Sequence, residues 1–121
     1  PGRVDNGTGQ RPQRAVTEYR VLSTAGGHLS WVLFSPKTGR THQLRVHSAL
    51  TLHAPIVGDE LYGTDKKLDG ALRSMLVTNN LFLLAYRLTF QHPGNGKMMT
   101  LCASVPEFMQ PVIKFLEFKL P

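Results

Sequence analysis

Several features that define whole classes of protein are absent from this sequence. There is one cysteine, Cys102, so the chain cannot form an internal disulfide. Acidic residues are scarce, 8 against 14 lysines and arginines, which gives a formal net charge of +6. No apolar run approaches the roughly 20 residues of a membrane-spanning helix. The lone thiol, expected to be buried in a strand, favours a reducing intracellular compartment, whether cytoplasm, mitochondrion or nucleus. The positive charge favours polyanionic partners and no membrane partner is expected.

Familiar catalytic and cofactor motifs are absent as well. The sequence has no Gly-x-Ser-x-Gly elbow, no phosphate loop of the Walker type and no pair of cysteines. Five histidines are present. His42 and His47 would lie about 140° apart around a helix, so they cannot bind one ion together as an i, i+4 pair does. We therefore expect neither a metal nor a cofactor.

The 121 residues are enough for one domain. Residues 1–13, rich in glycine and proline, are expected to form a flexible tail or linker, and 14–121 the folded part. Residues 64–80 are expected to form a loop with a short helix near 71–77. Alternating or continuous apolar residues predict strands, and apolar residues at helical spacing predict helices. The expected class is α+β, an antiparallel or mixed sheet with packed helices: strands at 14–22, 29–35, 81–90 and 98–103, helices at 41–52 and 107–119.

The most informative stretch is 38–63. Threonines near its start can cap a helix, Gly39 allows a bend, and Pro55 ends the pattern. On a helical projection Gln43, His47 and Thr51 form one polar stripe, with Val46, Ala49, Leu50 and Leu52 on the other side. His42 and Arg45 lie among those apolar residues.

Arg45 is the unusual residue of this helix. An arginine cannot lose its charge, so on a half-buried face it needs a carboxylate or a phosphate. Two partners fit: Asp59 in the same stretch, or a carboxylate from another part of the protein. His42, on residue type alone, fits a structural role behind the site.

The same stretch carries a family resemblance. The run GRTHQLRVH (39–47), then PIVGD (55–59) and Tyr62-Gly63, resembles the third conserved motif of the RluA-type RNA pseudouridine synthases. The similarity extends over most of residues 15–109. It implies the C-terminal half of that α+β catalytic domain, an activity that isomerises uridine to pseudouridine in RNA, and no cofactor.

The resemblance also implies roles for individual residues. Arg45 would pair with the family's catalytic aspartate, which lies in a His-Arg-Leu-Asp segment. None of the four aspartates here has that context. The chain alone is therefore expected to be inactive, with RNA and the missing N-terminal half as partners. Leu83 or Leu84 would form an apolar wall near the base, and Lys37, Arg40, His42 and His47 would lie near the RNA phosphates. The alternative is a non-catalytic RNA-binding or interaction module derived from the same fold.

Overall fold

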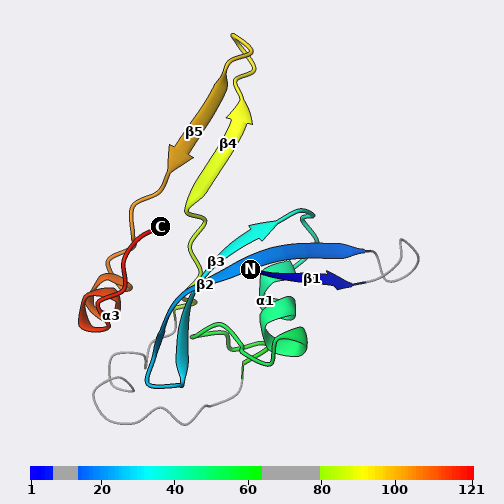
Figure 1. Cartoon of the computed structure of the whole chain (residues 1–121). Helices are drawn as coiled ribbons and strands as arrows, with labels where there is room; N and C mark the ends of the chain where they lie inside the picture. Colours follow the sequence, from blue (N-terminus) through cyan, green and yellow to red (C-terminus); the bar gives the residue numbers. More distant parts are fainter. Residues whose placement is uncertain (7–13, 64–79) are drawn as a thin grey trace.

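The computed structural model of the chain describes residues 1–6, 14–63 and 80–121. In this part the chain forms two antiparallel sheets and short helical segments, which agrees with the expected α+β class (Figure 1). The first sheet has the strand order β1-β2-β3, and the second is the hairpin β4-β5. None of the helices in these three ranges is long and apolar enough to cross a membrane. The expected helix near 71–77 lies outside the described residues.

The first sheet begins earlier than the sequence suggested. β1 (Gly2–Asn6) pairs with β2 (Ala15–Ala25), and β2 pairs with β3 (Leu29–Pro36). The expectation of a flexible tail is therefore wrong for residues 2–6, and 7–13 lie outside the described residues. Cross-strand contacts explain the difference, because Val4 opposite Thr17 is only 4% exposed and Arg14 holds Asp5 at 2.7 Å.

The helix of the central stretch has two parts. α1 (Gln43–Val46) continues into one π-helical turn, η1 (His47–Thr51), in which the Leu52 N–H donates to the His47 carbonyl. The expected helix at 41–52 is thus confirmed in place. At each end a histidine has left-handed backbone angles, His42 with φ 50° and His53 with φ 55°.

The second sheet is a hairpin that projects away from the rest of the chain (Figure 1). β4 (Arg87–Gln91) pairs with β5 (Met98–Cys102). The expected strand at 81–90 is wrong in its first half, because the Phe82 N–H donates to the Val57 carbonyl instead of joining a ladder. Cys102 is exposed on β5, so the expectation that it is buried is also wrong.

The last helix, α3 (Gln110–Phe115), is shorter than the expected 107–119. Pro111 lies within its first turn and has no N–H to donate, which prevents an earlier start. Glu117 has a left-handed φ of 56°, and the Phe118 N–H donates to the Ile113 carbonyl. This is a Schellman C-cap, which ends the helix without glycine.

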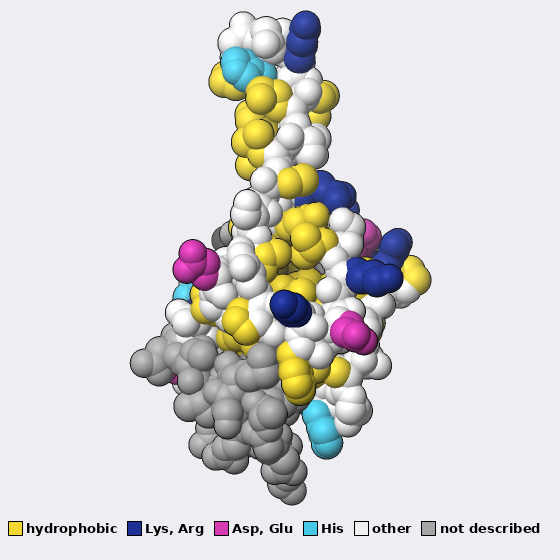
Figure 2. Space-filling model, turned by 90° about the vertical axis from the view of Figure 1, so that its left-hand side faces the viewer, with side chains coloured by type: hydrophobic (Ala, Val, Ile, Leu, Met, Phe, Trp, Pro, Cys, Tyr) yellow, Lys and Arg dark blue, Asp and Glu magenta, His cyan; other side chains and the backbone are white. Residues whose placement is uncertain are grey.

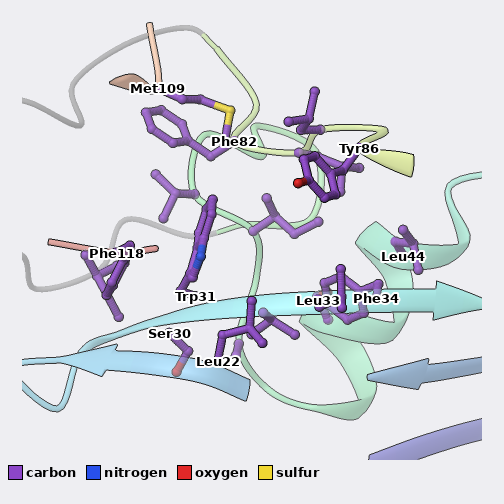
Figure 3. Close-up of a pocket in the computed structure, with 18 of the residues that line it drawn as sticks. Leu22, Ser30, Trp31, Leu33, Phe34, Leu44, Phe82, Tyr86, Met109 and Phe118 are labelled. Atoms are coloured by element: carbon purple, nitrogen blue, oxygen red, sulfur yellow. The ribbon is translucent and has the colours of Figure 1, made fainter. Parts of the chain in front are cut away.

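The apolar core of the described chain is small. The buried hydrophobic residues belong to two groups, one in the first sheet and one around α3: Val4, Ala15 and Val16, and Met109 and Val112. Between the sheet and α3 runs an open groove of about 1990 Å³, which we call the apolar groove. Trp31 of β3, Phe82 and Met109 approach one another across it (Figure 3). Much apolar surface is therefore left facing this groove instead of a closed core.

Candidate functional site around Arg45

A tight turn after Pro55 places Asp59 beside the helix. The Asp59 N–H donates to the Ile56 carbonyl, and Gly58 supplies a φ of 83° that side chains rarely adopt. The Asp59 Oδ1 atom then accepts the backbone N–H groups of Leu61 and Tyr62 at 3.1 and 3.0 Å. The carboxylate is thus fixed by its own turn before it meets a cation.

Arg45 forms a two-pronged ion pair with this carboxylate. Its Nη2 lies 2.8 Å from Oδ1 and its Nε 3.1 Å from Oδ2. The Asp59 side chain is fully buried, whereas 22% of the Arg45 side chain is exposed. The hydrogen bond from Arg45 lowers the pKa of Asp59 to about 2, with help from the two backbone N–H groups. Of the two partners expected for Arg45, the structure shows the local one.

This pair changes the argument about Arg45. The hypothesis that its guanidinium lacks an acid within the chain is wrong. A guanidinium carries five N–H donors, however, and Asp59 uses only Nε and one hydrogen of Nη2. The Nη1 edge remains able to bind a second carboxylate.

Tyr62 and His42 surround the exposed part of the guanidinium. The Arg45 Cζ atom lies 5.3 Å from the centre of the Tyr62 ring, within cation–π range. The Tyr62 hydroxyl lies 3.1 Å from His42 Nδ1, and the two rings meet edge to face. His42 is exposed and keeps its left-handed φ, an energetic cost that is concentrated at functional sites.

A buried hydrogen-bond network ties the motif to β2, and Gln43 is its centre. The Gln43 Oε1 atom accepts the Thr38 hydroxyl and the Arg40 N–H, at 2.6 and 3.0 Å. Its Nε2 donates to the Val16 carbonyl and to Thr17 Oγ1, both at 2.9 Å. Every polar atom of the Gln43 side chain is thus engaged, and the orientation of its amide is fixed.

The network continues from Thr17 to His47. Since Thr17 Oγ1 accepts from Gln43, its hydroxyl hydrogen is free to donate to His47 Nδ1, 2.7 Å away. Burial lowers the pKa of His47, which favours the neutral ring. Among the described residues, the buried His47 Nε2 atom and the buried Ser48 hydroxyl have no hydrogen-bond partner. Each such group costs free energy that a water or another segment would relieve.

These contacts correct two expectations about the helix. His47 is 1% exposed and bonds to β2, so it is not available to RNA phosphates. Of the polar stripe, Gln43 and His47 face inward, at 6% and 1% exposed, whereas Thr51 is exposed, and Leu50 on the apolar side is 63% exposed. Polar groups of β2 therefore bury the first part of the polar stripe.

Replacing Thr17 with valine tests this network. Thr17 is fully buried, and valine keeps its shape but removes the hydroxyl between Gln43 and His47. We expect the free energy of unfolding to fall by about 1–3 kcal/mol, the usual cost of leaving buried polar atoms unpaired. Urea unfolding measures the change. The matched control is Thr100→Val, which removes an exposed threonine–threonine bond of 2.8 Å. Equal effects of the two substitutions would contradict a special role of the network.

A small cavity of about 300 Å³ opens beside Arg45. Its lining joins the start of the helix to the segment before β4: Pro36, Thr38, Gly39, Arg40, His42, Gln43, Leu44, Arg45 and Leu83. Four expected site residues thus meet at one place, namely Arg40, His42, Arg45 and Leu83. The other three do not: Leu84 lines the apolar groove, Lys37 pairs with Glu18 at 3.4 Å, and His47 is buried.

Sequence reasoning missed Tyr62, Thr17 and Gln43 as parts of the site. Tyr62 had a usable signal, because it lies three residues after Asp59, close to the Gly-Asp turn. Thr17 had none, since its partners lie 26 and 30 residues away in sequence. Within the described residues, no three His, Cys, Asp or Glu side chains are grouped so that they could hold a metal ion.

Comparison with known proteins identifies relatives of this chain. Residues 2–50 match the family model described as RNA pseudouridylate synthase. Ribosomal large subunit pseudouridine synthase D of Zymomonas mobilis is 40% identical over 106 residues, which are 88% of this chain and 33% of that protein. The dual-specificity RNA pseudouridine synthase RluA of Salmonella typhi is 43% identical over 86 residues, 71% of this chain and 36% of that protein.

A solved structure has the same fold. The human protein called RNA Pseudouridylate Synthase Domain Containing 4 superposes with a TM-score of 0.71 and 32% identity, over 90% of this chain and 45% of that one. The fold is therefore that of an RNA pseudouridine synthase domain. The chain belongs to the RluA-type family of these enzymes. It spans about a third of the length of the curated relatives it matches.

Proposed function

We propose that this chain is the C-terminal portion of an RNA pseudouridine synthase that isomerises uridine to pseudouridine in RNA. The observation that carries the proposal is the fixed Arg45 guanidinium. Asp59 and Tyr62 hold it at the mouth of the 300 Å³ cavity, with its Nη1 edge still free of Asp59. In this proposal that edge binds a catalytic aspartate supplied by a part of the enzyme that this chain does not contain.

In the proposed reaction Arg45 has two roles, to keep the catalytic aspartate ionised and to orient it. A nucleophilic aspartate has to be ionised, and a cation in contact with a carboxylate lowers its pKa by about 1–3 units. The carboxylate also has to be oriented toward the sugar of the target nucleotide. An arginine already held by Asp59 loses little further freedom when it binds the second carboxylate. In this role Asp59 positions Arg45 and does not attack the substrate.

The other residues of the cavity suit a flipped uridine and its flanking phosphates. Leu83 supplies apolar surface, whereas His42 and Arg40 are exposed at the rim. Arg40 donates through Nε to the Arg14 carbonyl, at 3.1 Å, which leaves its terminal nitrogens for a phosphate. Lys37 and Leu84 lie outside this cavity and are proposed only for more distant contacts with RNA. An intracellular location, expected from the lone cysteine, stays a prediction.

The test is a hybrid protein in which this chain replaces the matching 106 residues of the Zymomonas mobilis synthase D. We expect the hybrid to form pseudouridine in a ribosomal RNA transcript, measured by tritium release from 5-tritiated uridine. Arg45→Ala should lower turnover by about 100-fold or more, because the catalytic carboxylate would lose its orientation. RNA binding should change far less. Arg87→Ala, at an exposed arginine of the hairpin, is the control. Near-normal turnover of the Arg45→Ala hybrid would contradict the proposal.

A non-catalytic RNA-binding module is the second candidate. It is favoured by the contacts of Asp59, the acid that pairs with Arg45, because its carboxylate is held by Arg45 and by two backbone N–H groups. The same hybrid separates the two candidates. No pseudouridine, together with RNA binding that weakens steeply with salt, would favour the module.

A further inference from the structure

The two faces of the β4-β5 hairpin differ sharply. Side chains alternate between the faces of a strand, and the register places Leu88 opposite Leu101 and Phe90 opposite Met99. These four apolar side chains share one side of the hairpin, which we call the apolar face. The next pair, Thr89 and Thr100, lies on the other side and is joined by a hydrogen bond between the hydroxyls.

The apolar face is open to solvent in this chain. Leu88 is 61% and Leu101 52% exposed, and the hairpin projects beyond the rest of the described structure (Figure 1). A two-stranded hairpin is only marginally stable in water without something packed on its apolar side. The sequence nevertheless builds this side with large hydrophobic residues. Such a surface is typical of one that another segment covers.

The apolar face continues into the apolar groove. Leu88 belongs to both, since it also lines the groove with residues from β3, α1, the segment before β4, and the stretch that leads into α3: Leu33, Leu44, Phe82, Leu84 and Met109. Figure 2 shows hydrophobic side chains on the hairpin and again in the hollowed region below it. The buried Ser48 hydroxyl has no hydrogen-bond partner within residues 1–6, 14–63 and 80–121, and Ser48 also lines this groove. The surface is thus continuous and apolar, and it contains one buried hydroxyl, that of Ser48, whose hydrogen-bonding capacity is unused among the described residues.

We infer that the apolar face of β4-β5, together with the apolar groove, is the docking surface for the rest of the synthase domain. This rests on the proposed function. The occupant follows from the comparisons, in which the chain accounts for 45% of a matching solved chain and 33% of the Zymomonas mobilis synthase D. More than half of that solved chain remains to cover this surface. Leu88 and Leu101 at the projecting hairpin and Ser48 in the groove are the residues that contact it.

The experiment uses the full 121-residue chain and, as probe, the part of the Zymomonas mobilis synthase D upstream of its matching segment. Light scattering and calorimetry are expected to give a 1:1 complex. The pair Leu88→Lys with Leu101→Lys should weaken binding by about 100-fold, since two large apolar side chains lose their burial. The matched control, Gln91→Lys with Met98→Lys, adds the same charges to a cross-strand pair on the opposite face of the hairpin, and neither residue lines the apolar groove. It should change the affinity by less than about 3-fold.

A second variant tests whether weaker binding results from unfolding of the hairpin and not from loss of its apolar surface. Leu88→Thr with Leu101→Thr introduces β-branched residues that favour strands and removes the large apolar side chains. It should weaken binding while circular dichroism stays unchanged. The inference is overturned if no complex forms, or if the lysine variants of the Leu88/Leu101 pair and of the Gln91/Met98 pair weaken binding equally. It is equally overturned if the chain forms a dimer by itself that the leucine variants dissociate.

Activity is measured separately on the mixed pieces. A complex without pseudouridine formation would count against the proposed function and leave the docking surface standing. If the mixed pieces form pseudouridine equally well with and without the Leu88 and Leu101 substitutions, the proposed function stands and the docking surface does not.

Discussion

Replacing Asp59 with asparagine is expected to lower the free energy of unfolding by about 2 kcal/mol at neutral pH. Asparagine keeps an oxygen for the Leu61 and Tyr62 N–H groups but removes the negative charge that Arg45 binds. The magnitude follows from the pKa of Asp59, which falls from 3.8 to about 2 in the folded chain, at 1.36 kcal/mol for each unit. Asp59→Ala removes the turn bonds as well and should cost more. Urea unfolding at pH 7 measures both.

The pH dependence supplies the control for this prediction. A carboxylate with a lowered folded pKa stabilises the fold above its unfolded pKa and loses that effect as the pH falls. The contribution of Asp59 should therefore be complete above about pH 4 and disappear toward pH 2. Wild type and Asp59→Asn should converge in stability over this window, because other acid-sensitive groups such as Asp5 and His47 are common to both. A difference that stays constant down to pH 2 would show that the charge of Asp59 is not what stabilises the turn.

The local order of the site could be predicted from sequence. The helix at 41–52, the turn that ends in Asp59 and the candidate Arg45–Asp59 pair depend on residues close together in the chain, so helical periodicity and turn chemistry locate them. The expected threonine cap is wrong, because the N-cap of α1 is His42 and makes no side-chain cap hydrogen bond. The antiparallel partners of β3 and β5 were likewise found from alternation and turns. These features need no knowledge of distant segments.

What the sequence did not reveal depends on distant partners. Periodicity found the stripe of Gln43 and His47, but only the hydroxyl and carbonyl groups of β2 explain why that stripe is buried. The run 81–90 has strand composition, yet its first half bonds to the loop around Val57 and forms a wall of the apolar groove. The Schellman cap was not predicted either, because its left-handed position is occupied by Glu117 and not by a glycine.

The largest effect on stability is expected from Gly58→Ala. Gly58 has a φ of 83°, and a Cβ atom there would overlap the backbone carbonyl of Asn80. A backbone neighbour cannot move aside as a flexible side chain can. Left-handed strain and the clash together should cost about 3–5 kcal/mol. The turn that carries Asp59 would shift, so Arg45 should lose its partner in the same variant. Thermal unfolding measures the loss, and the Asp59 pKa, followed by NMR, should return toward 3.8.

Two other glycines separate the causes of this effect. Gly27 has a similar φ of 71° but nothing within 4 Å of a Cβ, so Gly27→Ala reports left-handed strain alone, about 1–2 kcal/mol. Gly39 lies in the motif itself with neither the positive φ nor a neighbour within 4 Å, and its alanine variant should be within about 0.5 kcal/mol of wild type. The expected order of destabilisation is therefore Gly58, Gly27, Gly39. If Gly58→Ala cost no more than Gly27→Ala, the close approach of the Asn80 carbonyl would not constrain the turn. The position of Asp59, on which the role of Arg45 depends, would then need another cause.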